Sequence, residues 1–103
     1  MSLKEKQKQV DDWIKQYPEG YWNPLEIICR LTEEVGELAR EVNHEYGPKK
    51  KKTTEDENDI GDEISDVIFT LIGLANSLDI DLDEKFDKMM KKYSERDGNR
   101  WEK

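Results

Sequence analysis

Carboxylates at helical spacing are the residues of this chain best suited to chemistry. Glu33, Glu34 and Glu37 form the pattern E-E-x-x-E, and Glu63 and Asp66 form the pattern E-x-x-D. Residues three or four positions apart are neighbours on one face of an α-helix. Either pattern alone is typical of a solvated helix surface, where a like-charge pair is destabilising by only about 0.2–0.5 kcal/mol.

The two patterns become informative together because each lies beside an apolar stripe. One stripe, within 24–46, contains Leu25, Ile28, Leu31, Val35, Leu38 and Val42. A broader arc, within 59–78, contains Ile64, Val67, Ile68, Leu71, Ile72, Leu74, Ala75 and Leu78. If these stripes pack antiparallel, four carboxylates share a small volume. Two unit charges about 4 Å apart repel by about 4 kcal/mol at an effective dielectric of roughly 20, so the cluster must take up protons or bind a cation.

The type of donor atom indicates which cation such a cluster would bind. A set of carboxylate oxygens suits Mg²⁺, with Mn²⁺ as a substitute, and zinc is not expected because Cys29 and His44 do not share the face of the acids. Magnesium held by carboxylates commonly meets substrate phosphates, which predicts phosphoryl transfer or hydrolysis. The sequence has no Gly-rich Walker loop. Basic side chains must then hold the phosphates, and segment 81–97 supplies Lys85, Lys88, Lys91, Lys92 and Arg96.

Four helices are expected to position these residues. Pro18, Gly20 and Pro24 separate the first two, Asn23 is a good N-cap before Pro24, and Gly47 ends the second. The expected ranges are 3–16, 24–46, 59–78 and a fourth that Asp81 or Asp83 caps and that runs to 97. No strand signal of useful length is present. The fold class is therefore an all-α, four-helix bundle in a single domain, 1–103, with a polar loop at 47–58 and a polar tail at 98–103.

Composition excludes several classes of protein. The chain has 103 residues, of which 41% are charged, and a formal net charge of -8. This negative charge argues against sequence-independent binding to DNA or RNA. No apolar run reaches the length of about 18 residues that a membrane span needs, and the polar first nine residues lack the apolar core of a signal peptide. The single cysteine fits a reducing compartment, so a cytoplasmic location is expected.

The apolarity of segment 59–78 and the small size of the domain predict association between chains. A helix as apolar as 59–78 cannot be covered by one neighbour, and a small domain buries a modest share of its surface. We expect a homodimer or homotetramer that completes the core, with a site to which two chains contribute. Trp13 shares a face with Val10 and Tyr17 and is expected in the core. Trp22 lies in the loop before the second helix, where a base could stack on it.

The segment Leu31-Thr-Glu-Glu-Val-Gly-Glu-Leu38, followed by Glu63-Ile-Ser-Asp66 on an apolar helix, resembles the MazG-like nucleoside triphosphate pyrophosphohydrolases. These proteins belong to the all-α NTP pyrophosphatase superfamily, and the resemblance extends over about residues 10 to 97. It implies Mg²⁺-dependent cleavage between the α- and β-phosphates of a (deoxy)nucleoside triphosphate. The products would be a monophosphate and pyrophosphate, and the role would be removal of unwanted nucleotides.

The resemblance also assigns residues. Glu34, Glu37, Glu63 and Asp66 match the metal ligands, and either Glu33 or Glu34 would assist activation of water. Lys85 matches a lysine that related enzymes direct at the substrate phosphates, and Lys88 or Arg96 could substitute for such contacts from the same segment. Two departures are visible: Asp83 stands where some relatives have Asn, and Met89 where some have a basic residue.

Two alternatives stay open at this point. One lies within the superfamily, as a pyrophosphatase specific for dUTP or dCTP or for phosphoribosyl-ATP. The other is a non-catalytic helical module that binds metal or a partner protein.

Overall fold

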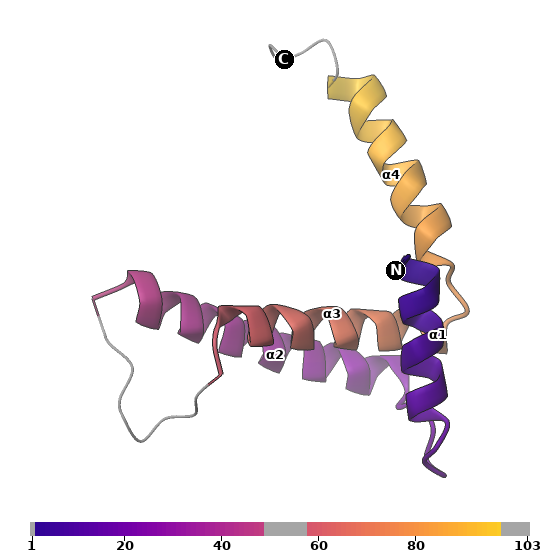
Figure 1. Ribbon diagram of the computed structural model, residues 1–103, viewed down its shortest axis with the longest axis horizontal. Coiled ribbons are helices and arrows are strands. Elements are labelled where there is room, and N and C mark those ends of the chain that lie inside the picture. The colour runs from indigo at the N-terminus through magenta and orange to yellow at the C-terminus, as the bar shows by residue number, and fades with distance from the viewer. Residues whose placement is uncertain (1, 49–57, 98–103) are drawn as a thin grey trace.

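The computed structural model describes residues 2–48 and 58–97, and Figure 1 shows their arrangement. The helices are α1 (Leu3–Ile14), α2 (Pro24–Tyr46), α3 (Ile60–Ser77) and α4 (Leu82–Asp97). The prediction of an all-α chain with four helices is confirmed, and the described residues contain no strand. None of the described helices combines the length and apolarity that crossing a membrane requires. The predicted tail and most of the predicted polar loop lie outside the described residues.

Local capping fixes where the helices begin. The Asn23 side chain accepts a hydrogen bond from the Glu26 backbone N–H (3.0 Å), with Pro24 in the first turn of α2. Asp59 and Asp62 exchange hydrogen bonds in a capping box at the start of α3. These side chains satisfy backbone donors that a helix start leaves without intrahelical partners.

The two aspartates expected to compete for the start of α4 have separate functions. The Asp81 carboxylate accepts from the Glu84 backbone N–H (3.3 Å) and caps α4. The Asp83 carboxylate instead accepts from the backbone N–H groups of Leu3 and Lys4, each at 3.2 Å. Asp83 therefore neutralises the positive end of α1 and ties the first helix to the last.

α2 and α3 run antiparallel and form the centre of the fold (Figure 1). The face that α2 turns toward α3 carries the buried residues Ile27, Glu34, Glu41 and His44. Most of the expected apolar stripe of α2 does not face α3, since Leu25 is 80% exposed and Ile28, Val35 and Val42 are also exposed, while Leu31 and Leu38 are half-buried. That part of the sequence prediction is wrong: the acidic face, not the apolar stripe, packs inside the chain. Hydrophobic periodicity shows which residues share a helix face, but not which face packs on α3.

A polar network fixes the junction of α1, α3 and α4. The Gln7 amide donates to the Asn76 side chain (2.9 Å) and to the Ile80 carbonyl (2.7 Å), and its oxygen accepts from the Leu82 backbone N–H (3.0 Å). The Asn76 side-chain amide donates in turn to the backbone carbonyl of Gln7 at 2.9 Å. α4 packs chiefly on α1 and projects away from the α2–α3 pair (Figure 1).

Candidate functional site

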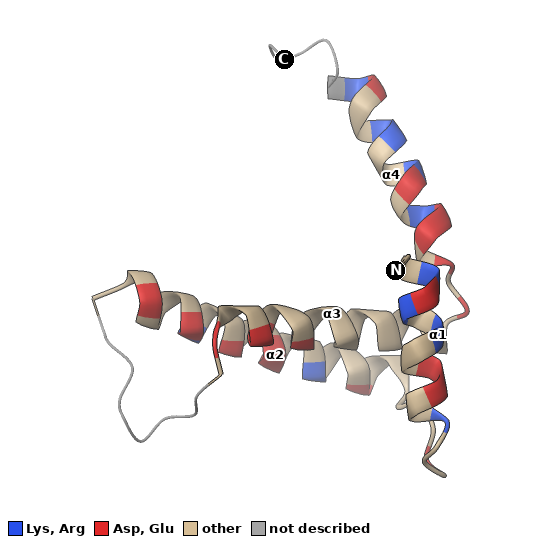
Figure 2. Cartoon of the chain, in the orientation of Figure 1, with Lys and Arg blue, Asp and Glu red and all other residues tan. Residues whose placement is uncertain are grey.

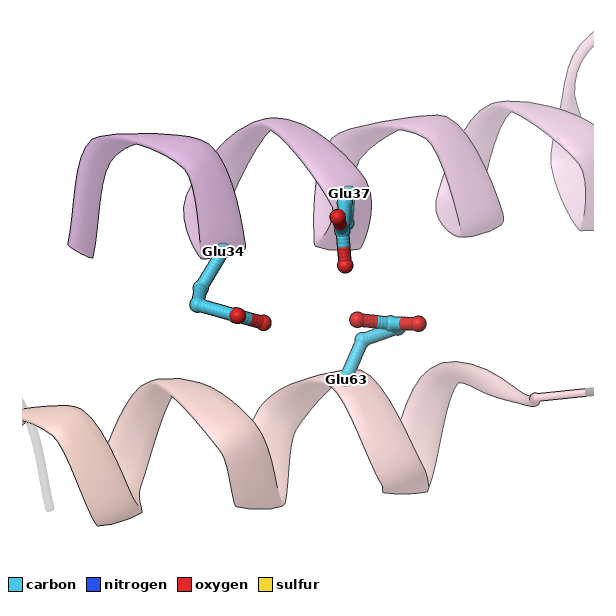
Figure 3. Close-up of side chains that lie close together, drawn as sticks. All are labelled: Glu34, Glu37 and Glu63. Atoms are coloured by element: carbon cyan, nitrogen blue, oxygen red, sulfur yellow. The ribbon is translucent and has the colours of Figure 1, made fainter. Parts of the chain in front are cut away.

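Three carboxylates meet between α2 and α3. Glu34 and Glu37 extend from α2, Glu63 extends from the first turn of α3, and Figure 3 shows their side chains pointing toward one another across the gap. One oxygen from each carboxylate lies within 4.8 Å of the other two. The antiparallel pairing produces this meeting because it sets the middle of α2 opposite the start of α3. We call these three residues the acidic cluster.

The two other expected acids lie outside the acidic cluster. Asp66, one turn further along α3, is exposed and borders a neighbouring cavity, and its charge raises the pKa of both Glu34 and Glu63. Glu33 is exposed, with one carboxylate oxygen 3.6 Å from the Arg30 guanidinium. The structure therefore brings together three of the four expected ligands, with the fourth nearby.

Burial is the first cause of the electrostatic strain in the acidic cluster. It raises the pKa of Glu34 and of Glu63, and the charge of Glu37 raises both further. The Arg30 charge opposes this for Glu34, and a hydrogen bond from Asn58 opposes it for Glu63. The Oε2 atoms of Glu34 and Glu63 are buried and accept no hydrogen bond from any residue that the structure describes. Buried acceptors without donors, on carboxylates this close, fit a hard divalent cation such as Mg²⁺ or Mn²⁺.

Arg30 is the residue that sequence reasoning missed. Its Nη2 lies 2.7 Å from Glu34 Oε1, one helical turn away on α2. The available signal was the spacing of four residues between Arg30 and Glu34, which is common on helix surfaces and therefore weak.

A cavity of about 620 Å³ adjoins the acidic cluster, within the range of small-molecule sites. Glu34 and Asp66 stand on its border, and five aromatic side chains line it: Trp13, Tyr17, Tyr21, Trp22 and Phe69. The expectation that Trp13 is a core residue is wrong. Trp13 is 49% exposed and stands edge-on to Phe69, with ring centroids 5.6 Å apart. It lies on an open aromatic wall, which no other described element covers on this side.

Tyr21 supplies a fixed polar group in that wall. Its hydroxyl donates a hydrogen bond to the Asp11 carboxylate of α1. Burial, and then this hydrogen bond, raise the pKa of Tyr21 to about 12. The phenol therefore stays protonated at physiological pH, and it ties the loop before α2 to α1.

The basic residues expected to hold phosphates lie elsewhere. Lys85, Lys88 and Arg96 are on α4, which borders neither the acidic cluster nor the cavity. Figure 2 shows the Lys and Arg residues of α4 on the arm that projects from the α2–α3 pair. Arg96 lies over the Tyr93 ring, 5.1 Å from its centroid. Within one chain, the structure does not bring these cations to the acids.

The antiparallel helix pair brings an acidic cluster suited to a divalent cation beside an aromatic cavity suited to a flat ligand, and comparison with known proteins identifies the family. Residues 23–101 match the family described as the MazG nucleotide pyrophosphohydrolase domain. The chain belongs to this family.

Particular relatives are similar along nearly the whole chain. The uncharacterized protein YpjD of Bacillus subtilis (strain 168) is 55% identical over 100 residues, which covers 97% of this chain and 90% of YpjD. The crystal structure of YPJD from Bacillus subtilis superposes with a TM-score of 0.81 over 90% of this chain and 95% of that one. A Bacillus-conserved MazG protein described as a nucleotide pyrophosphohydrolase gives a TM-score of 0.78 at 46% identity, over 90% of each chain.

Proposed function

We propose that this protein is a Mg²⁺-dependent pyrophosphohydrolase that cleaves (deoxy)nucleoside triphosphates to monophosphates and pyrophosphate, in the cytoplasm, as part of nucleotide-pool house-cleaning. The observation that carries the proposal is the acidic cluster of Glu34, Glu37 and Glu63 beside the aromatic cavity. The cavity offers apolar surface for a base, and the cluster offers charge for a metal-bound phosphate chain. The relative described as a nucleotide pyrophosphohydrolase supports the same reaction class.

The proposal assigns roles to particular side chains. Glu34, Glu37, Glu63 and Asp66 hold Mg²⁺, for which Mn²⁺ can substitute. When bound, the metal neutralises phosphate charge and lowers the pKa of an attacking water. Either Glu33 or Glu34 would accept a proton from the attacking water. Glu34 is the one of the two that lies in the acidic cluster, whereas Glu33 is exposed. Trp22, on the cavity wall, stacks on the base.

We further propose that the chain works as a homodimer or homotetramer. The radius of gyration is 17.1 Å, against about 13 Å for a compact domain of this length. Exposed apolar residues follow both central helices, namely Leu25, Ile28, Val35, Val42, Ile64, Ile68 and Leu71. A second copy that covers these residues completes the core. The projecting α4 can then carry Lys85, Lys88 and Arg96 to the phosphates in the partner's site.

A charge placed on the exposed stripe tests this association. Val35→Asp puts a carboxylate in the groove that Leu38, Val42 and Tyr46 also line. Burying an unpaired charge is strongly unfavourable, so the variant should dissociate to monomers at micromolar concentration in multi-angle light scattering. Gln9→Asp adds the same charge on an exposed polar position of α1 and should leave the oligomer intact. A wild-type chain that is monomeric at this concentration contradicts the proposal.

The reaction itself is tested by pyrophosphate release from a panel of ribo- and deoxynucleoside triphosphates that includes dUTP and dCTP, with phosphoribosyl-ATP alongside. We expect release with Mg²⁺ and none with chelator, and monophosphate as the second product. A rate confined to dUTP, dCTP or phosphoribosyl-ATP favours the corresponding specific enzyme. If Mg²⁺ binds but no member releases pyrophosphate, the protein is a non-catalytic metal-binding module.

A further inference from the structure

Arg30 stands on the border between the acidic cluster and the aromatic cavity. It is the one basic side chain among the residues that line the cavity in the described parts of the chain. Its guanidinium bonds one oxygen of Glu34 at 2.7 Å and lies 3.6 Å from Glu33. The Glu34 side chain is 4% exposed, whereas that of Arg30 is 51% exposed. A half-exposed cation is thus paired with a buried acid of the site.

The ion pair between Arg30 and Glu34 partly neutralises the negative charge of the acidic cluster. Burial, Glu37, Asp66 and Glu33 all disfavour the ionised form of Glu34, and the Arg30 charge is what opposes them. A divalent cation on Glu34 supplies the same neutralisation with twice the charge. Two cations on one carboxylate repel each other, so the guanidinium and the metal compete for Glu34.

The geometry also offers Arg30 a second partner. A nucleotide with its base in the aromatic cavity and its phosphates at the acidic cluster must cross the border between them. In that pose the phosphate next to the sugar, the α-phosphate, would lie at this border, where Arg30 stands. A guanidinium presents a planar fork of donors that matches two oxygens of a phosphate, and an exposed arginine can turn about its long stem without disturbing the core.

We infer that Arg30 exchanges partners during the reaction cycle: it neutralises Glu34 until a divalent cation occupies that carboxylate, and then binds the α-phosphate of the nucleotide. This inference rests on the proposed function. It makes Arg30 a substrate-contacting residue whose charge opposes binding of metal alone and favours binding of nucleotide with metal. The two effects have opposite signs, and a purely structural arginine would not produce them.

Isothermal titration calorimetry on the whole chain tests both expected effects, on the affinity for metal alone and on the affinity for nucleotide with metal. With Mn²⁺ alone at pH 8, Arg30→Ala should bind metal about threefold to tenfold more tightly than wild type, because a competing cation is gone. With saturating Mg²⁺, the same variant should bind nucleoside monophosphates, which keep the α-phosphate, about tenfold or more weakly. Arg30→Lys keeps the charge but not the fork, so it should bind Mn²⁺ like wild type and monophosphate at intermediate affinity.

Arg40→Ala removes an arginine from the same helix, outside the cavity lining, and should change neither affinity. If Arg30→Ala binds Mn²⁺ more weakly or equally, Arg30 merely orients Glu34 and the inference is wrong. Unchanged monophosphate affinity also overturns it. Failure of the wild type to release pyrophosphate bears on the proposed function instead, because the Mn²⁺ titration needs no turnover.

Discussion

Glu63→Gln is expected to lower Mg²⁺-dependent pyrophosphate release by about 10³-fold, which corresponds to several kcal/mol of lost transition-state stabilisation. Glu63 is buried, one of its oxygens accepts no hydrogen bond, and it lies within 4.8 Å of the other two acids of the cluster. The amide keeps the shape of the side chain but removes its charge and one acceptor oxygen. The measurement is the initial rate on whichever triphosphate the panel shows to react fastest.

Matched variants separate a site effect from a general effect of charge. Glu45→Gln removes an exposed carboxylate from the last turn of α2 and should retain the wild-type rate. Glu37→Gln should resemble Glu63→Gln. Asp66→Asn should lose less, because Asp66 is exposed and stands outside the three-oxygen group. A Glu63→Gln enzyme that keeps more than about a tenth of the rate would remove Glu63 from the metal site.

The helices and their ends were predictable because their signals are local. Asn23 with Pro24 was such a signal, and the structure adds Asp59 with Asp62; each pair acts on backbone groups within three residues of itself. Hydrophobic periodicity likewise follows from a geometry that each segment carries alone. The meeting of Glu34 and Glu37 with Glu63 was also accessible, since acids paired at one helical turn on two adjacent helices can face each other when the helices run antiparallel.

The orientation of α2 was not predictable in the same way. The sequence shows an apolar stripe and an acidic edge on α2, and reasoning from burial turns the stripe toward α3. In the structure the acidic face packs on α3, and Val35 and Val42 stay exposed. In the proposed oligomer α2 has neighbours both within its own chain and in a second copy, and hydrophobic periodicity does not distinguish between the two.

The aromatic cavity and Arg30 needed tertiary structure for a related reason. Phe69 of α3 is distant in sequence from Trp13 and Trp22, and the three side chains line one space because α1 packs against α3. For α4, the sequence suggested a site contact that the structure does not make within one chain. Its lysines look suited to phosphates in sequence, yet the Gln7 network and the Asp83 cap hold the helix away from the acids.

The same Glu63→Gln substitution is expected to stabilise the fold when chelator removes divalent cations. The pKa of Glu34 and of Glu63 is raised above the ordinary 4.5, first by burial, so the folded chain holds more protons than the unfolded chain from pH 4.5 up to the raised values. In that window stability falls as pH rises. At pH 7.5 the charged cluster is a net cost, and Gln removes one of its charges. We expect a gain of about 1–2 kcal/mol, or roughly 4–16 °C in Tm.

The test is thermal unfolding of wild type and Glu63→Gln at pH 5 and pH 7.5, with chelator or with Mg²⁺. The Tm advantage of the variant should be larger at pH 7.5 than at pH 5, because protonation at low pH relieves the same repulsion in the wild type. Mg²⁺ should raise the Tm of the wild type by linkage and have little effect on the variant. A variant less stable than wild type in chelator at pH 7.5 would mean that Asn58, 3.5 Å from Glu63, already compensates its charge. The acidic cluster would then need no metal to be stable.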